Sequence, residues 1–138
     1  MTPGGFGPGG AGLETVIVVM VGGGIGAVTR YLVDREVQSR HETGFPLGTM
    51  LVNLAGSFLL GCLVGAGRHL APGLFALLAT GVCGALTTYS TFSFETWRLA
   101  EQRRFGLAAV NALGTVLGCI VAVYAGFALV TTVVGGGA

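Results

Sequence analysis

The residues with the most chemical potential in this chain lie together between Gly84 and Glu95, where the sequence reads GALTTYSTFSFE. Five hydroxyl side chains and two aromatic rings fill the positions from Thr87 to Ser93. Hydroxyl groups can donate to a small anion, and aromatic rings can turn their positive edges toward it. No Lys or Arg lies in this segment. An anion would therefore be held by partial charges alone, which favours passage over trapping.

The composition indicates that this segment lies in a membrane. Of the 138 residues, 52% are hydrophobic and only 9% are charged, whereas soluble domains carry about 25% charged residues. So few charges could not cover a surface that faces water. We therefore predict an all-α integral membrane protein. A β-barrel is disfavoured because its strands alternate over about 10 residues, and the apolar runs here are long and continuous.

Four windows are long enough to cross a bilayer, which takes roughly 20 mostly apolar residues. They are Leu13–Val33, Pro46–Gly67, Pro72–Phe94 and Phe105–Val133. The connections between them, Asp34–Phe45, Arg68–Ala71 and Arg98–Arg104, are short, so neighbouring helices are expected to run antiparallel. Residues 13–133 are thus predicted to form a single four-helix transmembrane domain.

The third of these helices is predicted to break near its middle. Gly81 and Gly84 lower helix propensity there, and a break near Gly84–Thr88 would expose backbone carbonyl and amide groups. Inside a bilayer such a break is tolerated only where it is buried in protein or lines a cavity, and there it often binds ions. Tyr89 and Phe92 would follow it on one face of the resumed helix.

Stripes of small and polar residues run along the second and fourth windows. The second carries one at every fourth position: Thr49, Asn53, Ser57, Gly61 and Gly65. The fourth carries Asn111, Thr115 and Cys119 on one face. Small residues allow close backbone approach, so these stripes are typical of packing seams. Asn53 and Asn111 would either bond to another helix or face a polar pathway, and the sequence leaves both possibilities open.

The rest of the chain argues against an enzyme. No catalytic motif is present, and GGGIG at Gly22–Gly26 lacks the strand and the acidic partner of a dinucleotide site. The three cysteines, Cys62, Cys83 and Cys119, form no CxxC pair and are interpreted as small packing residues. We expect the Gly- and Pro-rich residues 1–12 to be a disordered tail without the basic start of a signal peptide. Residues 134–138 are expected to be a frayed tail.

Three motifs resemble the CrcB/Fluc family of fluoride channels. They are GGGIGAVTRY (Gly22–Tyr31), GTMLVNLAGSFLLG (Gly48–Gly61) and GALTTYSTFS (Gly84–Ser93), and they follow the family's order. The resemblance covers everything except the two tails. It implies a channel that exports cytoplasmic fluoride passively and confers fluoride resistance. It also implies an antiparallel, dual-topology-like dimer with fluoride pathways at the subunit interface and a structural Na⁺ ion at the centre.

The resemblance also implies roles for particular residues. The Na⁺ would bind the backbone carbonyls of Gly84 and Thr87 from both subunits, and carbonyl oxygen suits a hard cation. The residues carried over to the fluoride pathway are Asn53, Tyr89, Ser90, Thr91, Phe92 and Thr115, with Cys119 near Thr115 and Arg30 at a vestibule. The family pattern has phenylalanine where this chain has Tyr89, whose hydroxyl would either donate to fluoride or narrow the pathway.

The arginines are distributed unevenly, and the chain contains no lysine. Those on the side of the first and third connections are Arg30, Arg35, Arg40, Arg98, Arg103 and Arg104, whereas the other side carries only Arg68. Basic connections stay in the cytoplasm, which predicts a multi-pass cell-membrane protein with both termini outside. The family contains homodimers and also heterodimers of paralogous subunits with opposite fixed orientations, and this bias favours the heterodimer. Fluoride and membrane lipid are the other expected partners, and nucleic acid is not.

Two other classes of protein share this layout. A small four-helix multidrug exporter needs a membrane-embedded carboxylate to exchange protons for substrate. The glutamates here, Glu14, Glu42, Glu95 and Glu101, are all expected at the ends of spans. A non-transporting membrane adaptor would need only the packing seams, and it leaves TTYSTFS unexplained.

Overall fold

The computed structural model describes residues 10–135, and all regular secondary structure in that range is helical. Three columns are the nearly continuous helices α1 (Gly10–Arg40), α2 (Leu47–Ala66, extended by the short 3₁₀ turn η1, Gly67–His69) and α6 (Phe105–Gly135). The remaining column, third along the chain and called the third column below, is built from α3 (Pro72–Phe75), the π-helical η2 (Ala76–Cys83), α4 (Gly84–Leu86) and α5 (Tyr89–Glu101). Residues 1–9 and 136–138, where most of both predicted tails fall, lie outside the described range.

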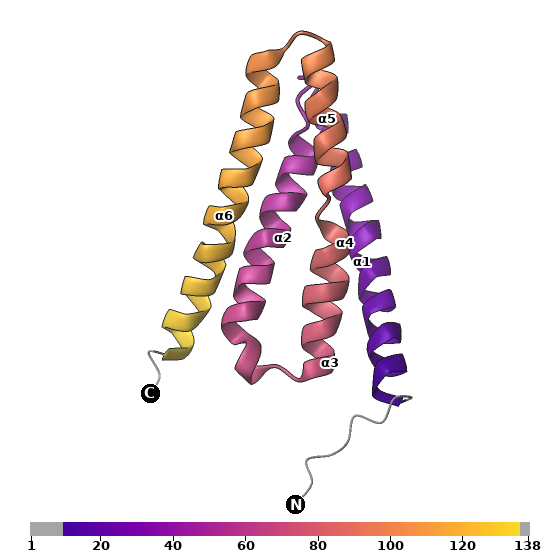
Figure 1. Ribbon diagram of the computed structural model, residues 1–138, viewed down its shortest axis with the longest axis vertical. Helices are drawn as coiled ribbons and strands as arrows, with labels where there is room; N and C mark the ends of the chain where they lie inside the picture. Colours follow the sequence, from indigo (N-terminus) through magenta and orange to yellow (C-terminus); the bar gives the residue numbers. More distant parts are fainter. Residues whose placement is uncertain (1–9, 136–138) are drawn as a thin grey trace, which may run out of the picture.

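Each column is long and apolar enough to cross a membrane. The four spans are Gly12–Arg40, Leu47–His69, Pro72–Glu101 and Phe105–Gly135. The prediction of an all-helical, multi-pass membrane protein is therefore confirmed. Figure 1 shows the α1–α2 and α5–α6 connections at one end of the bundle, and the α2–α3 connection at the other end, with the beginning of α1 and the end of α6.

The predicted end of the first helix at Val33 was wrong. α1 continues through Asp34 to Arg40, so most of the expected first loop is helical. The polar sequence DREVQSR ends the apolar window, but it contains good helix formers. An ion pair between Arg40 and Glu36, one turn apart and both exposed, supports this last part of the helix.

Close contact between α2 and α6 depends on glycines in both helices. A methyl group at Gly61 would collide with the carbonyl oxygen of Val123, and one at Gly126 would collide with the carbonyl oxygen of Phe58. In lipid, where hydrophobic attraction between helices is weak, such backbone proximity is a main source of association. The stripe of the second helix is therefore a packing seam over its Gly61 part, as predicted.

A second seam holds the third column against α1. Gly22 lies against the carbonyl oxygen of Leu77, and Gly26 lies against that of Val82, so neither position has room for a side chain. Cys83 is buried at the end of η2. None of the three cysteines forms a disulfide, and Cys62 and Cys119 are only partly buried. The two seams fix η2 and α4 between α1 and α2, and α2 against α6.

The α2–α6 seam makes a testable prediction. Gly126→Ala should lower the free energy of unfolding by about 1–3 kcal/mol, because the added methyl group forces two backbones apart. Gly24→Ala is the matched control, since nothing lies within 4 Å of the Cβ position at Gly24 and alanine is the better helix former. Denaturation in mixed detergent micelles measures both. A Gly126→Ala protein as stable as Gly24→Ala would contradict the seam.

Candidate functional site

The candidate site is centred on two extended residues between α4 and α5. Thr87 has φ −78° and ψ 156°, and Thr88 has φ −149° and ψ 127°. The Thr87 N–H and its Oγ1 both still donate to the carbonyl of Cys83, at 3.1 and 3.0 Å. Beyond that point the helical ladder stops. Because unpaired backbone groups are costly in a bilayer, the polar groups of this extended segment need other partners.

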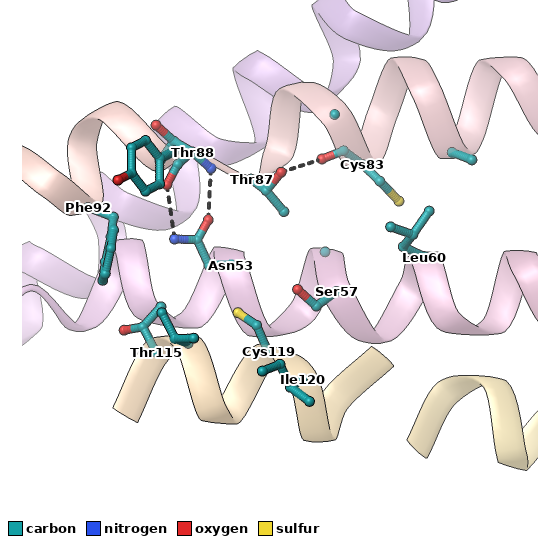
Figure 2. A pocket seen from close by; sticks show the side chains of 15 residues that line it. Asn53, Ser57, Leu60, Cys83, Thr87, Thr88, Phe92, Thr115, Cys119 and Ile120 are labelled. Carbon is teal, nitrogen blue, oxygen red and sulfur yellow. Dashed lines mark hydrogen bonds between the residues drawn. The ribbon is translucent and has the colours of Figure 1, made fainter. Parts of the chain in front are cut away.

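Asn53 of α2 supplies two of these partners. The Thr88 N–H donates to Asn53 Oδ1 at 2.7 Å, and Asn53 Nδ2 donates to the Thr88 carbonyl at 3.1 Å (Figure 2). In a continuous helix the Thr88 N–H would bond to the carbonyl of Gly84, so that carbonyl has lost its helical partner. An amide nitrogen carries two donors. One N–H of Asn53 therefore remains after this pairing.

Two further contacts hold the extended segment. Thr88 caps α5, because its Oγ1 accepts a hydrogen bond from the Thr91 N–H at 3.3 Å. Arg30 of α1 holds Thr87, because its Nη1 donates to the Thr87 carbonyl at 3.4 Å. The segment is thus held by side chains from α1 and α2 and by its own cap.

A cavity of about 470 Å³ lies beside this segment, with walls from α2, the third column and α6. Most of the predicted site residues line it: Asn53, Gly84, Thr87, Tyr89, Phe92, Thr115 and Cys119. The rings of Tyr89 and Phe92 have centroids 6.0 Å apart and are tilted by 45°. Tyr89 is 81% exposed in the single chain. None of the described residues that line the cavity is charged.

The structure does not bring the other predicted residues to this cavity. Arg30 and Thr91 line a separate cavity of about 180 Å³, and Thr88 lines both cavities. Ser90 is exposed and lines neither of these two cavities, and its Oγ lies 3.3 Å from Thr88 Oγ1. Of the hydroxyl residues in TTYSTFS, Thr87, Thr88 and Thr91 therefore line one or both cavities, whereas Ser90 lies at the surface.

A buried hydrogen-bond network connects α5 to α6 behind the cavity. Asn111, 1% exposed, donates through Nδ2 to Thr96 Oγ1 at 2.8 Å, and Thr96 donates to the Phe92 carbonyl at 2.8 Å. Thr115 Oγ1 donates to Asn111 Oδ1 at 3.5 Å. Asn111 thus bonds to another helix. The proton of the Thr115 hydroxyl points to Asn111, so its oxygen can only accept from the cavity.

Sequence reasoning assigned no role to several residues of these walls. Ser57 and Thr88 line the main cavity, and the sequence signals for Ser57 were its place in the polar stripe of α2 and in the motif GTMLVNLAGSFLLG. Glu95 is half-buried and accepts from Thr49 Oγ1 at 3.0 Å, so it is more enclosed than a glutamate at the end of a span was expected to be. Within the described range, no group of His, Cys, Asp and Glu could hold a metal ion.

The sequence is similar to a known family over most of its length, including the residues of this site. The family model for CrcB-like proteins (Camphor Resistance, CrcB) matches residues 17–127. Proteins named fluoride-specific ion channel FluC 1 from Frankia casuarinae and Streptomyces avermitilis are 48% and 47% identical, over 86% and 80% of this chain and 98% and 90% of their own lengths. The fluoride-specific ion channel FluC of Shewanella amazonensis is 42% identical, over 86% of this chain and 97% of its own.

The pairing of Asn53 with Thr88 can be tested directly. Asn53→Ala leaves the N–H and the carbonyl of Thr88 without partners, and each unpaired buried group costs about 1–3 kcal/mol. Hydrogen exchange at the Thr88 amide should accelerate by at least about tenfold, because local opening no longer breaks two bonds. Thr132→Ala, whose hydroxyl bonds only to its own helix, should leave that rate unchanged. An unaltered Thr88 rate in Asn53→Ala would show that the pairing contributes nothing.

Proposed function

Because the chain belongs to the family of CrcB-like proteins, and because relatives that it matches over most of its length are named fluoride-specific ion channels, we propose that it is a fluoride-selective channel. It would let cytoplasmic fluoride leave the cell passively and so confer fluoride resistance. The observation that carries the proposal is the uncharged cavity, which combines an amide donor at Asn53 with the ring pair Tyr89 and Phe92.

These groups suit a small anion in transit. Fluoride gives up strongly bound water when it enters a narrow site, and hydrogen-bond donors and ring edges can replace part of that hydration. The cavity walls contain no Lys or Arg, so no fixed positive charge would hold the ion in place. They contain no carboxylate either, which disfavours the proton-coupled exporter, since that mechanism needs one at the substrate site.

The cavity also supports the antiparallel dimer. Its walls include the exposed residues Tyr89, Val116 and Ile120, so in a single chain it is open on one side, and a second subunit placed there would close it. In this proposal α4 and α5 are the two halves of one broken membrane-spanning helix. The interface of the two subunits then contains the fluoride pathways.

The backbone around the extended segment fits a structural Na⁺ in part. The Gly84 carbonyl has lost its helical partner, and neutral oxygen is a suitable ligand for a hard cation. The Thr87 carbonyl already accepts from Arg30, which leaves it one lone pair. Two carbonyls are too few for one ion, so the second subunit would have to contribute the same pair. Bound there, the ion would hold the two subunits together electrostatically.

Fluoride efflux from liposomes tests the channel proposal. The purified chain is reconstituted alone and, separately, with a CrcB-like subunit of opposite orientation, and fluoride and chloride efflux are compared with and without Na⁺. We expect fluoride to leave far faster than chloride and the flux to fall without Na⁺. Phe92→Ile should reduce fluoride flux by up to about tenfold, the equivalent of one lost aromatic interaction. Phe94→Ile is the matched control, because Phe94 is exposed and does not line the cavity. Equal chloride and fluoride fluxes would contradict the proposal.

The arginines support a single orientation and therefore a heterodimer. Those at the end of the bundle with the α1–α2 and α5–α6 connections are Arg35, Arg40, Arg103 and Arg104, and the opposite connection has Arg68 alone. This bias favours insertion with both termini outside. A second subunit inserted the other way would then be a paralogous chain.

Reporters at the termini test this orientation. A reporter active only in the cytoplasm should be silent at either terminus of this chain, and one active only outside should give signal. Replacing Arg103 and Arg104 with Gln removes two of the basic residues and should produce a mixed population. Mixed insertion of the unmodified chain, together with full fluoride efflux from that chain alone, would exclude the obligate heterodimer.

A further inference from the structure

Ser57 lacks the partner that several hydroxyl residues of this protein find in their own helix. These residues bond back to a carbonyl three or four positions earlier, as Ser and Thr usually do in membranes. The examples are Thr29 to Ile25, Thr87 to Cys83, Thr96 to Phe92, Thr131 to Phe127 and Thr132 to Leu129. Ser57 could bond to the Asn53 carbonyl in the same way. Within the described residues, however, it forms no hydrogen bond, and it lines the main cavity.

The position of Ser57 continues the site along α2. It lies one turn after Asn53 on the same face, which separates the two Cβ atoms by about 5–6 Å. Figure 2 shows Ser57 between the helix that carries Thr87 and Cys83 and the α6 residues Cys119 and Ile120. The neighbouring Gly56 leaves room for the methyl group of Thr87 to lie against α2. The Ser57 hydroxyl is therefore in the cavity wall at about the depth of the extended segment.

Three other hydroxyl groups in these walls already donate hydrogen bonds within the protein. The Thr87 hydroxyl donates to the Cys83 carbonyl, that of Thr88 donates to Thr91 Oγ1, and that of Thr115 donates to Asn111 Oδ1. Along α2, the groups left to donate into the cavity are the second N–H of Asn53 and the O–H of Ser57. They form a ladder of two donors along one helix.

We propose that Ser57 is a further anion-binding residue, whose hydroxyl receives fluoride from the Asn53 amide as the ion moves along α2. This inference rests on the proposed fluoride channel and adds a residue to its pathway. A hydrogen bond to an ion is about twice as strong as one between neutral groups. Two donors one turn apart let the ion form the second bond before it has fully left the first.

The hydroxyl suits an anion better than a cation. A cation would bind the Ser57 oxygen and make no use of its proton, which the apolar wall residues Leu60 and Ile120 do not bind either. A donor that finds an acceptor is better placed than one that does not. An anion accepts a hydrogen bond from that proton directly, so the free O–H of Ser57 favours an anion in the cavity.

Substitutions at Ser57 test the proposal in whichever liposome preparation conducts. The readout is the fluoride concentration that gives half-maximal efflux. Ser57→Ala should raise it by about tenfold, as expected for one lost hydrogen bond to a charged partner. Ser57→Thr keeps the hydroxyl and should stay near the wild-type value. Thr132→Ala removes an exposed hydroxyl that bonds to its own helix and should have no effect.

The outcomes separate this inference from the proposed function. Conduction by the wild type with an unchanged half-maximal concentration in Ser57→Ala would overturn the role of Ser57 alone. A shift only in the Na⁺ concentration that the flux requires would make Ser57 a cation ligand and would also overturn it. Absence of fluoride flux from wild type in both preparations would reject the channel and the inference together. If Ser57→Ala fails to assemble in gel filtration, Ser57→Cys, which keeps the volume with a much weaker donor, gives the same test.

Discussion

Backbone polar groups cannot stay unpaired inside a bilayer, and the two-point pairing of Asn53 with Thr88 is how this protein meets that requirement where its helical ladder stops. The amide group has the same donor and acceptor as a peptide unit, so it substitutes for the missing turn of helix. With Thr88 held in this way, α5 can start again on its own cap. The walls of the cavity follow from this contact, because it fixes how far α4 and α5 lie from α2.

The glycine seams make that contact possible. Asn53 reaches Thr88 only because α2 is held close to the third column, and that column is fixed in turn by Gly22 and Gly26 of α1. On the other side, Gly61 and Gly126 bring α6 near enough to provide the third wall. Small residues in this bundle therefore serve the site as well as the fold. A larger side chain in either seam would move a wall of the cavity.

Much of this arrangement could be predicted from the sequence. The end of α1 and the choice of residues that line the main cavity could not. Long apolar runs predicted the four spans, and the four-residue stripe of α2 predicted a packing seam but not that its partner is α6. The end of α1 was misplaced because hydropathy marks where an apolar run stops, whereas α1 continues to Arg40 through good helix formers and the Arg40–Glu36 ion pair. Ser90 and Thr91 were grouped with Phe92, yet neighbouring helical residues point about 100° apart. Only the orientation of α5 decides which of them meets the main cavity.

Asn53 also shows why the donor pattern of a site is hard to obtain from residue types. An amide can present either oxygen or N–H, and the sequence leaves the choice open. Here the Thr88 N–H requires the oxygen, and the Thr88 carbonyl takes one of the two N–H groups. The amide therefore cannot turn over without breaking both bonds, and the N–H that remains free stays on the nitrogen side of the fixed amide. The same logic acts in the opposite sense at Thr115, whose proton is drawn to Asn111. The backbone break and the buried network between α5 and α6 thus decide which wall can donate to an ion, although the residues in both walls are polar.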